Sequence, residues 1–239
     1  MRKETIMPNF RKQRIAGWIV RSLVVLFVIA LNTVLLWRVF FSARIPDEID
    51  NLAINDSLVA AYGEHGNKLQ LLYQDQATVT RAEHNYGYFS VPKCTFIPEA
   101  DQVQVVFRYN NGMLENLARD YGLGEIPSRD ETLFDVTLVQ TTDKTPDDKS
   151  DNTNAETLEK QRFTATSVKR ATTSLYTYYL YVFEGVSVAD DTAGVFVDIY
   201  YLDDIDYEKG AYGTLCVYSP DDKWLTHSMT KDDKRALGD

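Results

Sequence analysis

The sequence has few of the residues from which catalytic and metal sites are usually built. Its 239 residues include only two cysteines and three histidines. The patterns HExxH, GxSxG, GxxxxGK[ST] and GxGxxG, which mark common hydrolase, nucleotide and dinucleotide sites, do not occur. Two cysteines are also too few for a disulfide framework or a structural zinc site. We therefore expect no catalytic residues, no cofactor and no metal ligands, and a protein that is not an enzyme.

Basic residues are scarce beyond the N-terminus. Residues 1–44 hold 8 Lys and Arg and one acidic residue, which leaves 17 of the 25 basic and 34 of the 35 acidic residues to positions 45–239. That larger part has a net charge of −17. Binding to nucleic acid needs clustered Lys and Arg against the phosphates, so we exclude nucleic acid as a partner. The uneven charge indicates that the two ends of the chain face different environments.

Charge is absent from Ser22–Trp37, a stretch of sixteen mostly apolar residues. Crossing about 30 Å of hydrocarbon takes about 20 apolar residues, and the flanking sequence extends the apolar segment to 15–41, with Trp18 and Trp37 toward its two ends. Indole rings favour the membrane–water interface. A cleaved signal peptide has a shorter apolar core and small residues before the cut, and a buried soluble helix does not explain the preceding basic residues. We expect an uncleaved transmembrane anchor helix that contacts membrane lipid through residues 15–41.

The orientation follows from charge. Six basic residues precede the uncharged core, opposed only by Glu4, and acidic residues follow soon after it. By the positive-inside rule, residues 1–14 form a basic cytoplasmic tail and the C-terminal part lies outside the cell. We divide that part into a juxtamembrane segment with a short helix (42–66) and an extracytoplasmic β-rich domain (67–239). A single-pass bacterial cell-membrane protein is favoured, because cysteine is sparse and the sole glycosylation sequon is Asn55–Asp56–Ser57.

Strand-like runs dominate the C-terminal part. Apolar and polar residues alternate from Gln102 to Tyr109 and from Phe134 to Leu138, which is the pattern of half-buried strands. The run LYTYYLYVF at 175–183 is apolar or aromatic on both faces and fits a central strand covered on each side. We expect strands at 68–74, 86–91, 102–109, 132–140, 161–168, 174–184, 194–202 and 211–218. The expected fold is mainly β: one β-sandwich, with an immunoglobulin-like topology as one option.

Two short helices complete the expected fold. One covers Asp56–Glu64 and is capped by Asn55 or by its own first aspartate. The other covers 111–124, where Asn111 would cap the start. Residues 141–158 are polar and lack apolar periodicity, so we expect an exposed loop there.

Candidate reactive residues do not converge in the sequence. Cys94 and Cys216 could form a disulfide outside the membrane, but each lies in a strand-like run, and we favour two thiols that pack as small apolar groups. The histidines are His65, His84 and His227. The first two follow a glutamate directly, and adjacent side chains point in different directions on a helix or a strand, so this spacing does not build a shared acid–base site.

Acidic and aromatic clusters are the other candidates. The segment DDIDYE at 203–208 offers oxygen ligands for calcium, but it lacks the DxDxDG spacing, and we favour a solvated turn; the same holds for the acidic pairs 190–191 and 221–222. Nine of the fifteen tyrosines lie near the C-terminus: Tyr176, Tyr178, Tyr179, Tyr181, Tyr200, Tyr201, Tyr207, Tyr212 and Tyr218. Tyrosine is a good strand residue, which is the interpretation we favour, and it also suits contact surfaces for proteins and sugars.

These observations favour a membrane-anchored, non-catalytic binding or scaffolding module outside the cytoplasm. Its expected partner is another envelope or membrane protein. The alternative is a module that binds carbohydrate, such as cell-wall glycan, on a tyrosine-rich sheet face. A third option is an extracytoplasmic hydrolase whose carboxylates converge from distant loops.

Overall fold

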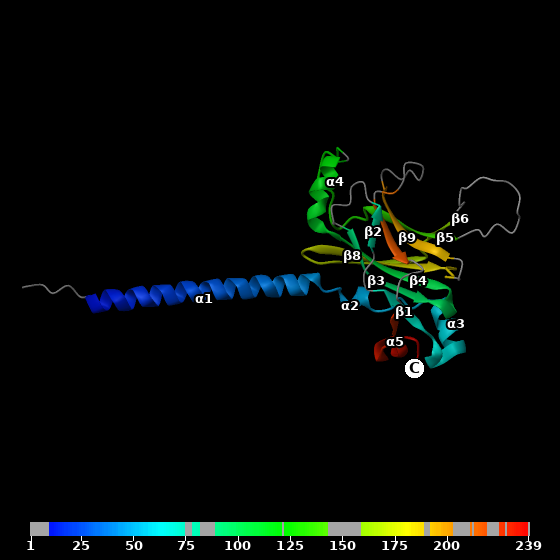
Figure 1. The fold of residues 1–239 in the computed structure, drawn as a ribbon, viewed down its shortest axis with the longest axis horizontal. Coiled ribbons are helices and arrows are strands. Elements are labelled where there is room, and N and C mark those ends of the chain that lie inside the picture. Colours follow the sequence, from blue (N-terminus) through cyan, green and yellow to red (C-terminus); the bar gives the residue numbers. More distant parts are fainter. Residues whose placement is uncertain are drawn as a thin grey trace, which may run out of the picture. The chain divides into compact units, whose positions relative to one another are not determined.

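The computed structural model of the chain describes residues 10–74, 78–81, 89–120, 122–142, 159–188, 192–202, 211, 213–218, 225–227 and 229–238. Contacts divide the chain into two compact units, Met1–Arg44 and Ile45–Asp239. Figure 1 shows that the first unit is helical and that strands dominate the second.

The first unit contains α1 (Phe10–Ala43), one continuous helix of 34 residues. Its segment Trp18–Trp37 has a mean hydropathy of 2.5, and none of it is buried. At 1.5 Å per residue, twenty helical residues span about 30 Å. By length and composition α1 can cross a membrane. A signal sequence near the N-terminus can meet the same two criteria. A helix from the core of a soluble protein would be mostly buried, and the segment Trp18–Trp37 is not.

Two polar side chains in this segment bond to the helix itself. The Asn32 amide donates to the Val28 carbonyl at 2.8 Å, and the Thr33 hydroxyl donates to the Ile29 carbonyl at 2.9 Å. Bonds of this kind to the carbonyl four residues earlier are open to polar side chains inside a helix. They reduce the cost of placing these groups in an apolar surrounding without a second helix.

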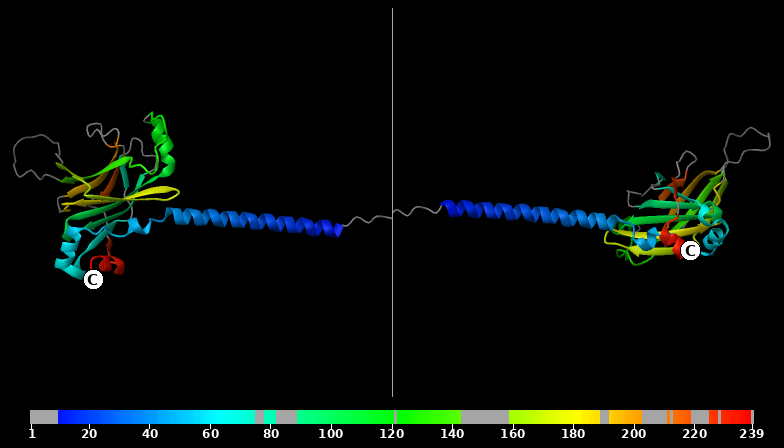
Figure 2. Two further views of the ribbon diagram at one scale, coloured as in Figure 1. Left: turned by 180° about the vertical axis from the view of Figure 1, so that it is seen from behind. Right: turned by 90° about the horizontal axis from the view of Figure 1, so that it is seen from below.

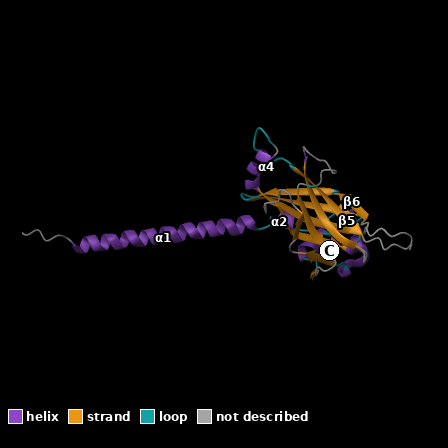
Figure 3. Ribbon diagram, turned by 45° about the horizontal axis from the view of Figure 1, so that its top comes forward, coloured by secondary structure: helices purple, strands orange, loops and turns teal. Residues whose placement is uncertain are grey.

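The second unit is built from two antiparallel sheets packed face to face (Figures 2 and 3). Sheet A contains β1 (Leu71–Gln74), β3 (Phe89–Ile97), β4 (Gln102–Asn110), β7 (Ser167–Thr172), β8 (Tyr176–Glu184) and β11 (Leu225–His227). Sheet B contains β2 (Thr78–Arg81), β5 (Phe134–Thr142), β6 (Glu159–Thr164), β9 (Thr192–Tyr201) and β10 (Gly213–Tyr218). The strand orders are β11-β1-β3-β4-β8-β7 and β2-β10-β9-β5-β6. The expected mainly β unit of two packed sheets is therefore confirmed.

The main core lies between the two sheets and follows the predicted alternation. On β4, Val103, Val105 and Phe107 are fully buried and face sheet B. On β5, Val136 and Leu138 face them from the other side and are equally buried. Each such side chain contributes about 1.5–3 kcal/mol of hydrophobic stabilisation relative to an exposed position. The alternating runs in the sequence thus identify the inner faces correctly.

The prediction that the 174–184 strand is central and covered on both sides is also confirmed. β8 pairs with β4 on one side and β7 on the other. Its residues 177–183 are all buried. One set points into the main core (Tyr179, Tyr181 and Phe183), and the other points to the outer face of sheet A (Tyr178, Leu180 and Val182).

That outer face is covered by the first residues of the unit. Ile49, on the short helix α2 (Asp47–Asp50), and Ala53 pack on the outward side chains of β4 and β8. The Gln104 side chain clamps Ala53, accepting from its backbone N–H at 2.9 Å and donating to its carbonyl at 2.8 Å. Lys93 pairs with Asp50 at 3.0 Å. Residues 49–53 are thus an integral part of the folded unit.

Two helices lie together beside β1 at one end of the sheets (Figure 1). α3 (Asp56–His65) begins at Asn55, whose side-chain oxygen accepts from the Leu58 N–H at 3.1 Å, and ends at Gly66 with φ of 54°. This confirms the predicted helix and cap. α5 (Lys231–Ala236) begins with a capping box between Thr230 and Asp233.

The second predicted helix is shorter than expected and has a different cap. It consists of the 3-10 turn η3 (Asn111–Met113) and α4 (Leu114–Asp120). The side chain of Asn110, not Asn111, accepts from the Gly112 N–H at 2.8 Å. Asn111 instead joins η3 to β8, accepting from the Thr177 hydroxyl at 2.7 Å. The predicted cap at Asn111 is therefore wrong by one residue.

Two strand predictions and one loop prediction need correction. The single strand expected at 161–168 is two strands in different sheets, β6 and β7, separated by Ala165 and Thr166. The loop expected at 141–158 begins later, because β5 continues through Thr142, and 143–158 lie outside the described residues. β3 extends to Ile97, six residues beyond the expected end. β2, β11, α2 and α5 were not expected.

Candidate functional site

The predicted reactive residues form no common site in the described part of the chain. His65 is exposed at the end of α3, and His227 lies in β11, whose side chains are not described. His84 and the acidic segments 190–191, 203–208 and 221–222 lie outside the described residues. Within the described residues, no group of three or more His, Cys, Asp or Glu is arranged to hold a metal ion.

The two cysteines lie on different faces of the sandwich and do not face each other. Cys94 on β3 is 1% exposed and belongs to the main core. On β10 the flanking Leu215 and Val217 face that core, so Cys216 points to the outer face of sheet B. Its thiol donates to the Tyr218 carbonyl at 3.2 Å. Both residues are thiols, as the sequence predicts. Burial raises the pKa of the Cys94 thiol well above its ordinary value.

Most of the C-terminal tyrosines are interior residues. Tyr207 and Tyr212 lie outside the described residues, Tyr176 and Tyr218 are half-buried, and the other five are at most 5% exposed: Tyr178, Tyr179, Tyr181, Tyr200 and Tyr201. The rings of Tyr179 and Tyr181 stack at 5.7 Å in the core. This arrangement supports the structural interpretation of the tyrosines and leaves these five without an open face for sugar stacking.

Burial changes the acidity of these tyrosines. It raises the pKa of Tyr179 and that of Tyr181, whose hydroxyl is buried with no hydrogen-bond partner in the described part of the chain. Burial also raises the pKa of Tyr178 and Tyr200, and the neighbouring Arg108 and Arg162 guanidinium groups offset part of each rise. All are therefore protonated hydroxyls at neutral pH.

The main cavity lies at the end of the sandwich that carries α4, beneath the loop from α4 to β5. This loop leaves the helix through a Schellman motif: the Leu123 N–H donates to the Ala118 carbonyl at 2.8 Å, and the Gly122 N–H to the Arg119 carbonyl at 3.3 Å. Gly122 has a φ of 62°, a left-handed conformation that favours glycine. The motif turns the chain back across the end of the core.

Further hydrogen bonds hold this loop in place. The Glu131 N–H donates to the Ser128 carbonyl at 3.1 Å, and the Arg170 guanidinium donates to the Asp130 carbonyl. The Leu202 N–H, at the end of β9, donates to the Leu133 carbonyl at 3.1 Å. The loop is therefore tied to itself, to β7 and to β9. Such anchoring favours a preformed surface over a loop that must be ordered by a ligand.

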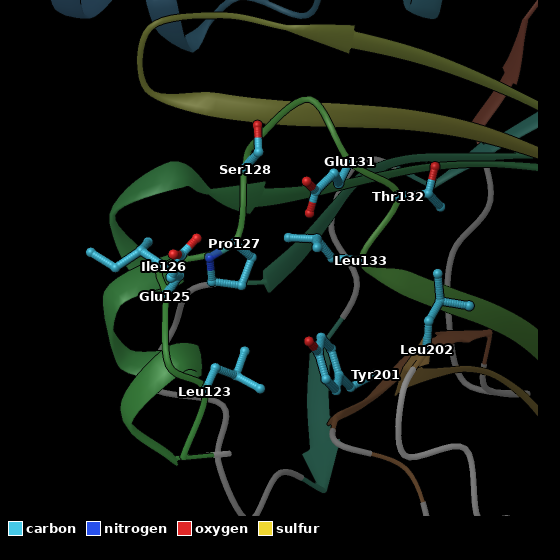
Figure 4. Close-up of a pocket in the computed structure, with 10 residues that line it drawn as sticks. All are labelled: Leu123, Glu125, Ile126, Pro127, Ser128, Glu131, Thr132, Leu133, Tyr201 and Leu202. Carbon is cyan, nitrogen blue, oxygen red and sulfur yellow. The ribbon is translucent and has the colours of Figure 1, made fainter.

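The cavity has a volume of about 430 Å³, within the usual range for ligand sites. Loop residues 125–128 and 131–133 line the cavity together with Tyr201 and Leu202, and the Tyr201 hydroxyl points into the space (Figure 4). Leu123 and Pro127 supply apolar wall, and the carboxylates of Glu125 and Glu131 supply negative charge. The arrangement can hold an apolar group and a positive charge together.

Exposure distinguishes this cavity from the rest of the domain. Among the described residues outside α1, four large apolar side chains are exposed: Val59 (45%), Ile126 (58%), Val168 (50%) and Leu202 (41%). Two of them, Ile126 and Leu202, line this one cavity. Exposed apolar residues on a cavity wall, with polar groups around them, are a feature of contact sites.

A second, smaller cavity of about 220 Å³ lies near the opposite ends of β3 and β8. Its walls are mainly apolar and include Phe96, Val186, Val188 and Tyr218. Gln102, which also lines it, donates to the Ser57 hydroxyl at 3.2 Å and accepts from Gln104 at 2.8 Å. Its polar group is thus engaged in holding the 53–57 segment, and the cavity offers no charged group.

Sequence reasoning missed the residues of the main cavity. The loop 125–131 reads EIPSRDE, between a predicted helix and a predicted strand. The available signal is Ile126, an isolated apolar residue beside Pro127 in an otherwise charged turn. Searches with the chain against protein families, curated proteins and solved structures gave no match in any of the three.

Proposed function

We propose that the chain is a single-pass membrane protein whose residues 45–239 form a non-catalytic protein-binding module outside the cytoplasm. The apolar, unburied segment Trp18–Trp37 supports the anchor. The basic residues before it and the acidic ones after it support a cytoplasmic N-terminus. The observation that carries the function is one cavity whose lining includes two exposed apolar residues, Ile126 and Leu202, together with carboxylates.

An immunoglobulin-like classification is supported by the strand order. In that fold one sheet has the order A-B-E-D, and the other contains C, F and G, with C′ added beside C in variable-type domains. The neighbours β3-β4-β8-β7 and β10-β9-β5-β6 follow A-B-E-D and G-F-C-C′ in both sequence and space. β1, β2 and β11 would be additions at the far edges. The strands at the B and F positions, β4 and β9, contain no cysteine, so the disulfide of antibody domains is not formed between them.

The length of the connecting chain supports a partner at the membrane. α1 ends at Ala43, and Ile49 is already buried against sheet A. Even a fully extended chain between these two residues covers only about 20 Å. A module on so short a connection reaches partners that are embedded in the membrane or lie on it. Another envelope or membrane protein is therefore the proposed partner class.

Site-specific photocrosslinking in intact membranes tests this function. A photoreactive amino acid replaces Ile126 or Leu202 in the full-length chain, and Val59 or Val168 in matched controls of similar exposure. We expect one membrane protein, identified by mass spectrometry, to crosslink from positions 126 and 202 and not from the controls. Absence of adducts from 126 and 202, or equal adducts from all four positions, would reject the proposal.

The anchor has its own test. In cells that express the full chain, residues 1–44 should stay attached to the mature protein, and the protein should resist extraction from membranes by alkaline carbonate. Protease added outside the cell should digest residues 45–239. A mature protein that begins after α1, or digestion only after lysis, would overturn the proposed anchor or its orientation.

A further inference from the structure

We infer that the cavity formed by loop 123–133 and the end of β9 binds a basic side chain, Lys or Arg, carried by an apolar peptide segment of the partner. This inference rests on the proposed protein-binding function and names the chemistry that the site recognises. Two features carry it: carboxylates available for pairing, and apolar surface placed beside them.

The first feature is the state of Glu125 and Glu131. Neither carboxylate forms an ion pair or hydrogen bond within the described part of the chain, and both residues are exposed. Some acidic side chains of the domain are engaged, such as Asp50 with Lys93 and Asp198 with Arg162 and Thr214. Others are exposed like Glu125 and Glu131, such as Glu48 and Glu64, but these two do not line the cavity. The cation nearest in sequence, Arg129, is exposed and does not line the cavity.

The second feature is the apolar surface beside these carboxylates. Ile126 and Leu202 are exposed, and the ring of Tyr201 is buried with its hydroxyl directed into the space (Figure 4). The stem of a Lys or Arg side chain is apolar and its end is charged. Such a side chain can place its methylenes on Leu123 and Pro127 while its charged end meets a carboxylate or the Tyr201 oxygen.

Two other occupants fit less well. A hard divalent cation takes six to eight oxygen ligands, often from several carboxylates, and Glu125 and Glu131 belong to no group of three or more His, Cys, Asp or Glu among the described residues that could hold a metal ion. A small organic cation would leave Ile126 and Leu202 exposed to water. A peptide segment with apolar residues beside the basic one covers both. The net charge of −17 on residues 45–239 would also attract a basic segment from a distance.

Fluorescence anisotropy on the full-length protein in nanodiscs of zwitterionic lipid tests the inference. The probe is a fluorescein-labelled peptide, Gly-Ser-Leu-Arg-Leu-Ser-Gly amide, and its matched control carries citrulline, a neutral isostere, in place of arginine. We expect the arginine peptide to bind at least about tenfold more tightly, and its binding to weaken as salt is raised, because exposed charges are screened. Empty nanodiscs give the lipid background.

Charge-neutral variants locate the effect. The double variant Glu125→Gln/Glu131→Gln should remove the preference for arginine over citrulline, and Glu48→Gln/Glu64→Gln, an equal charge change at exposed positions elsewhere, should keep it. Circular dichroism checks that both variants fold alike. Equal binding of the two peptides, no binding of either, or a preference that survives in Glu125→Gln/Glu131→Gln would overturn the inference. Crosslinking from position 126 would in those cases still support the protein-binding function.

Discussion

The outer faces of the two sheets are built in different ways. On sheet A, outward residues such as Val106, Leu180 and Val182 are apolar, and residues 49–53 cover them. On sheet B, the outward residues include a polar group centred on Asp198, which accepts from the Thr214 hydroxyl at 2.8 Å and the Tyr200 hydroxyl at 3.3 Å. An apolar face must be covered by chain, whereas a polar face can satisfy itself and stay open to water.

This difference determines where hydrogen bonds are most valuable. Covering sheet A buries the backbone of Ala53, and Gln104 supplies the missing partners from within the sheet. On sheet B, the carboxylate of Asp198 is 14% exposed and Arg162 beside it is 41% exposed, with 3.6 Å between the charged atoms. Water can replace partners that are lost on sheet B more readily than on sheet A.

Alkaline pH should unfold both sheets together, so that their outer faces no longer differ, because it ionises tyrosines in the core that the two sheets share. Burial raises the pKa of Tyr179 and Tyr181, so the folded state holds their protons where the unfolded chain, with a tyrosine pKa of about 10, releases them. The resulting stabilisation is fully present below about pH 10 and is lost as pH rises toward the folded-state pKa values. Circular dichroism and phenolate absorbance should therefore change together, in one steep transition.

An alkaline titration in which most tyrosines ionise gradually near pH 10, with the fold intact, would contradict the interior placement. Denaturant titrations at neutral and moderately alkaline pH provide the control. The denaturant concentration at the unfolding midpoint should stay constant up to about pH 9 and fall at higher pH, because only the unfolded chain then releases tyrosine protons.

On sheet A, Gln104→Ala should destabilise the unit by about 2–3 kcal/mol, because the buried N–H and carbonyl of Ala53 lose their partners together. Chemical denaturation of the full chain in detergent, followed by circular dichroism, measures the change. Gln161→Ala, at an exposed position of β6, is the matched control and should cost less than about 0.5 kcal/mol. Equal effects of the two substitutions would show that the 53–57 segment is not clamped to the sheet.

The sequence predicts the two faces unequally well. The apolar run at 175–183 shows that one strand is covered on both sides, and the alternation on β4 and β5 identifies the inner faces. The identity of the cover does not follow, because the clamp joins Gln104 to Ala53, 51 residues away, and no local pattern encodes that contact. The helix at α3 could be predicted because its cap, Asn55, and Gly66 are local signals.

The same reasoning explains the missed strand division and the missed site. Between β6 and β7 stand Ala165 and Thr166, without the Gly, Pro, Asn or Asp that usually marks a turn, so the two strands look like one. The main cavity exists because Leu202 bonds to Leu133, which brings the end of β9 under a loop 69 residues earlier in the chain. Ile126 alone could have suggested a contact site in this loop, but the sequence does not show that the loop and the end of β9 lie together.

On sheet B, Asp198→Ala should cost about 1 kcal/mol, less than Gln104→Ala, because the half-buried Thr214 hydroxyl can reach water and the Tyr200 hydroxyl still accepts from Arg162 at 3.0 Å. Asp198→Asn keeps an acceptor for Thr214 and should recover much of the loss. The same denaturation experiment measures both. A cost for Asp198→Ala that equals or exceeds that of Gln104→Ala would mean that sheet B is covered as tightly as sheet A.

The smallest expected effect is kinetic and concerns the two thiols. Cys94 lies in the shared core, where burial both blocks reagents and raises its pKa, so the reactive thiolate is scarce. Cys216 is half-buried on the outer face of sheet B. A soluble maleimide should therefore modify one thiol per native chain, at Cys216, and the second only with unfolding. Cys216→Ser should abolish native labelling, and Cys94→Ser should leave it unchanged. Rapid labelling of Cys94 in the native chain would place β3 in a different register, with Cys94 facing outward and the inner face of sheet A exchanged for its outer one.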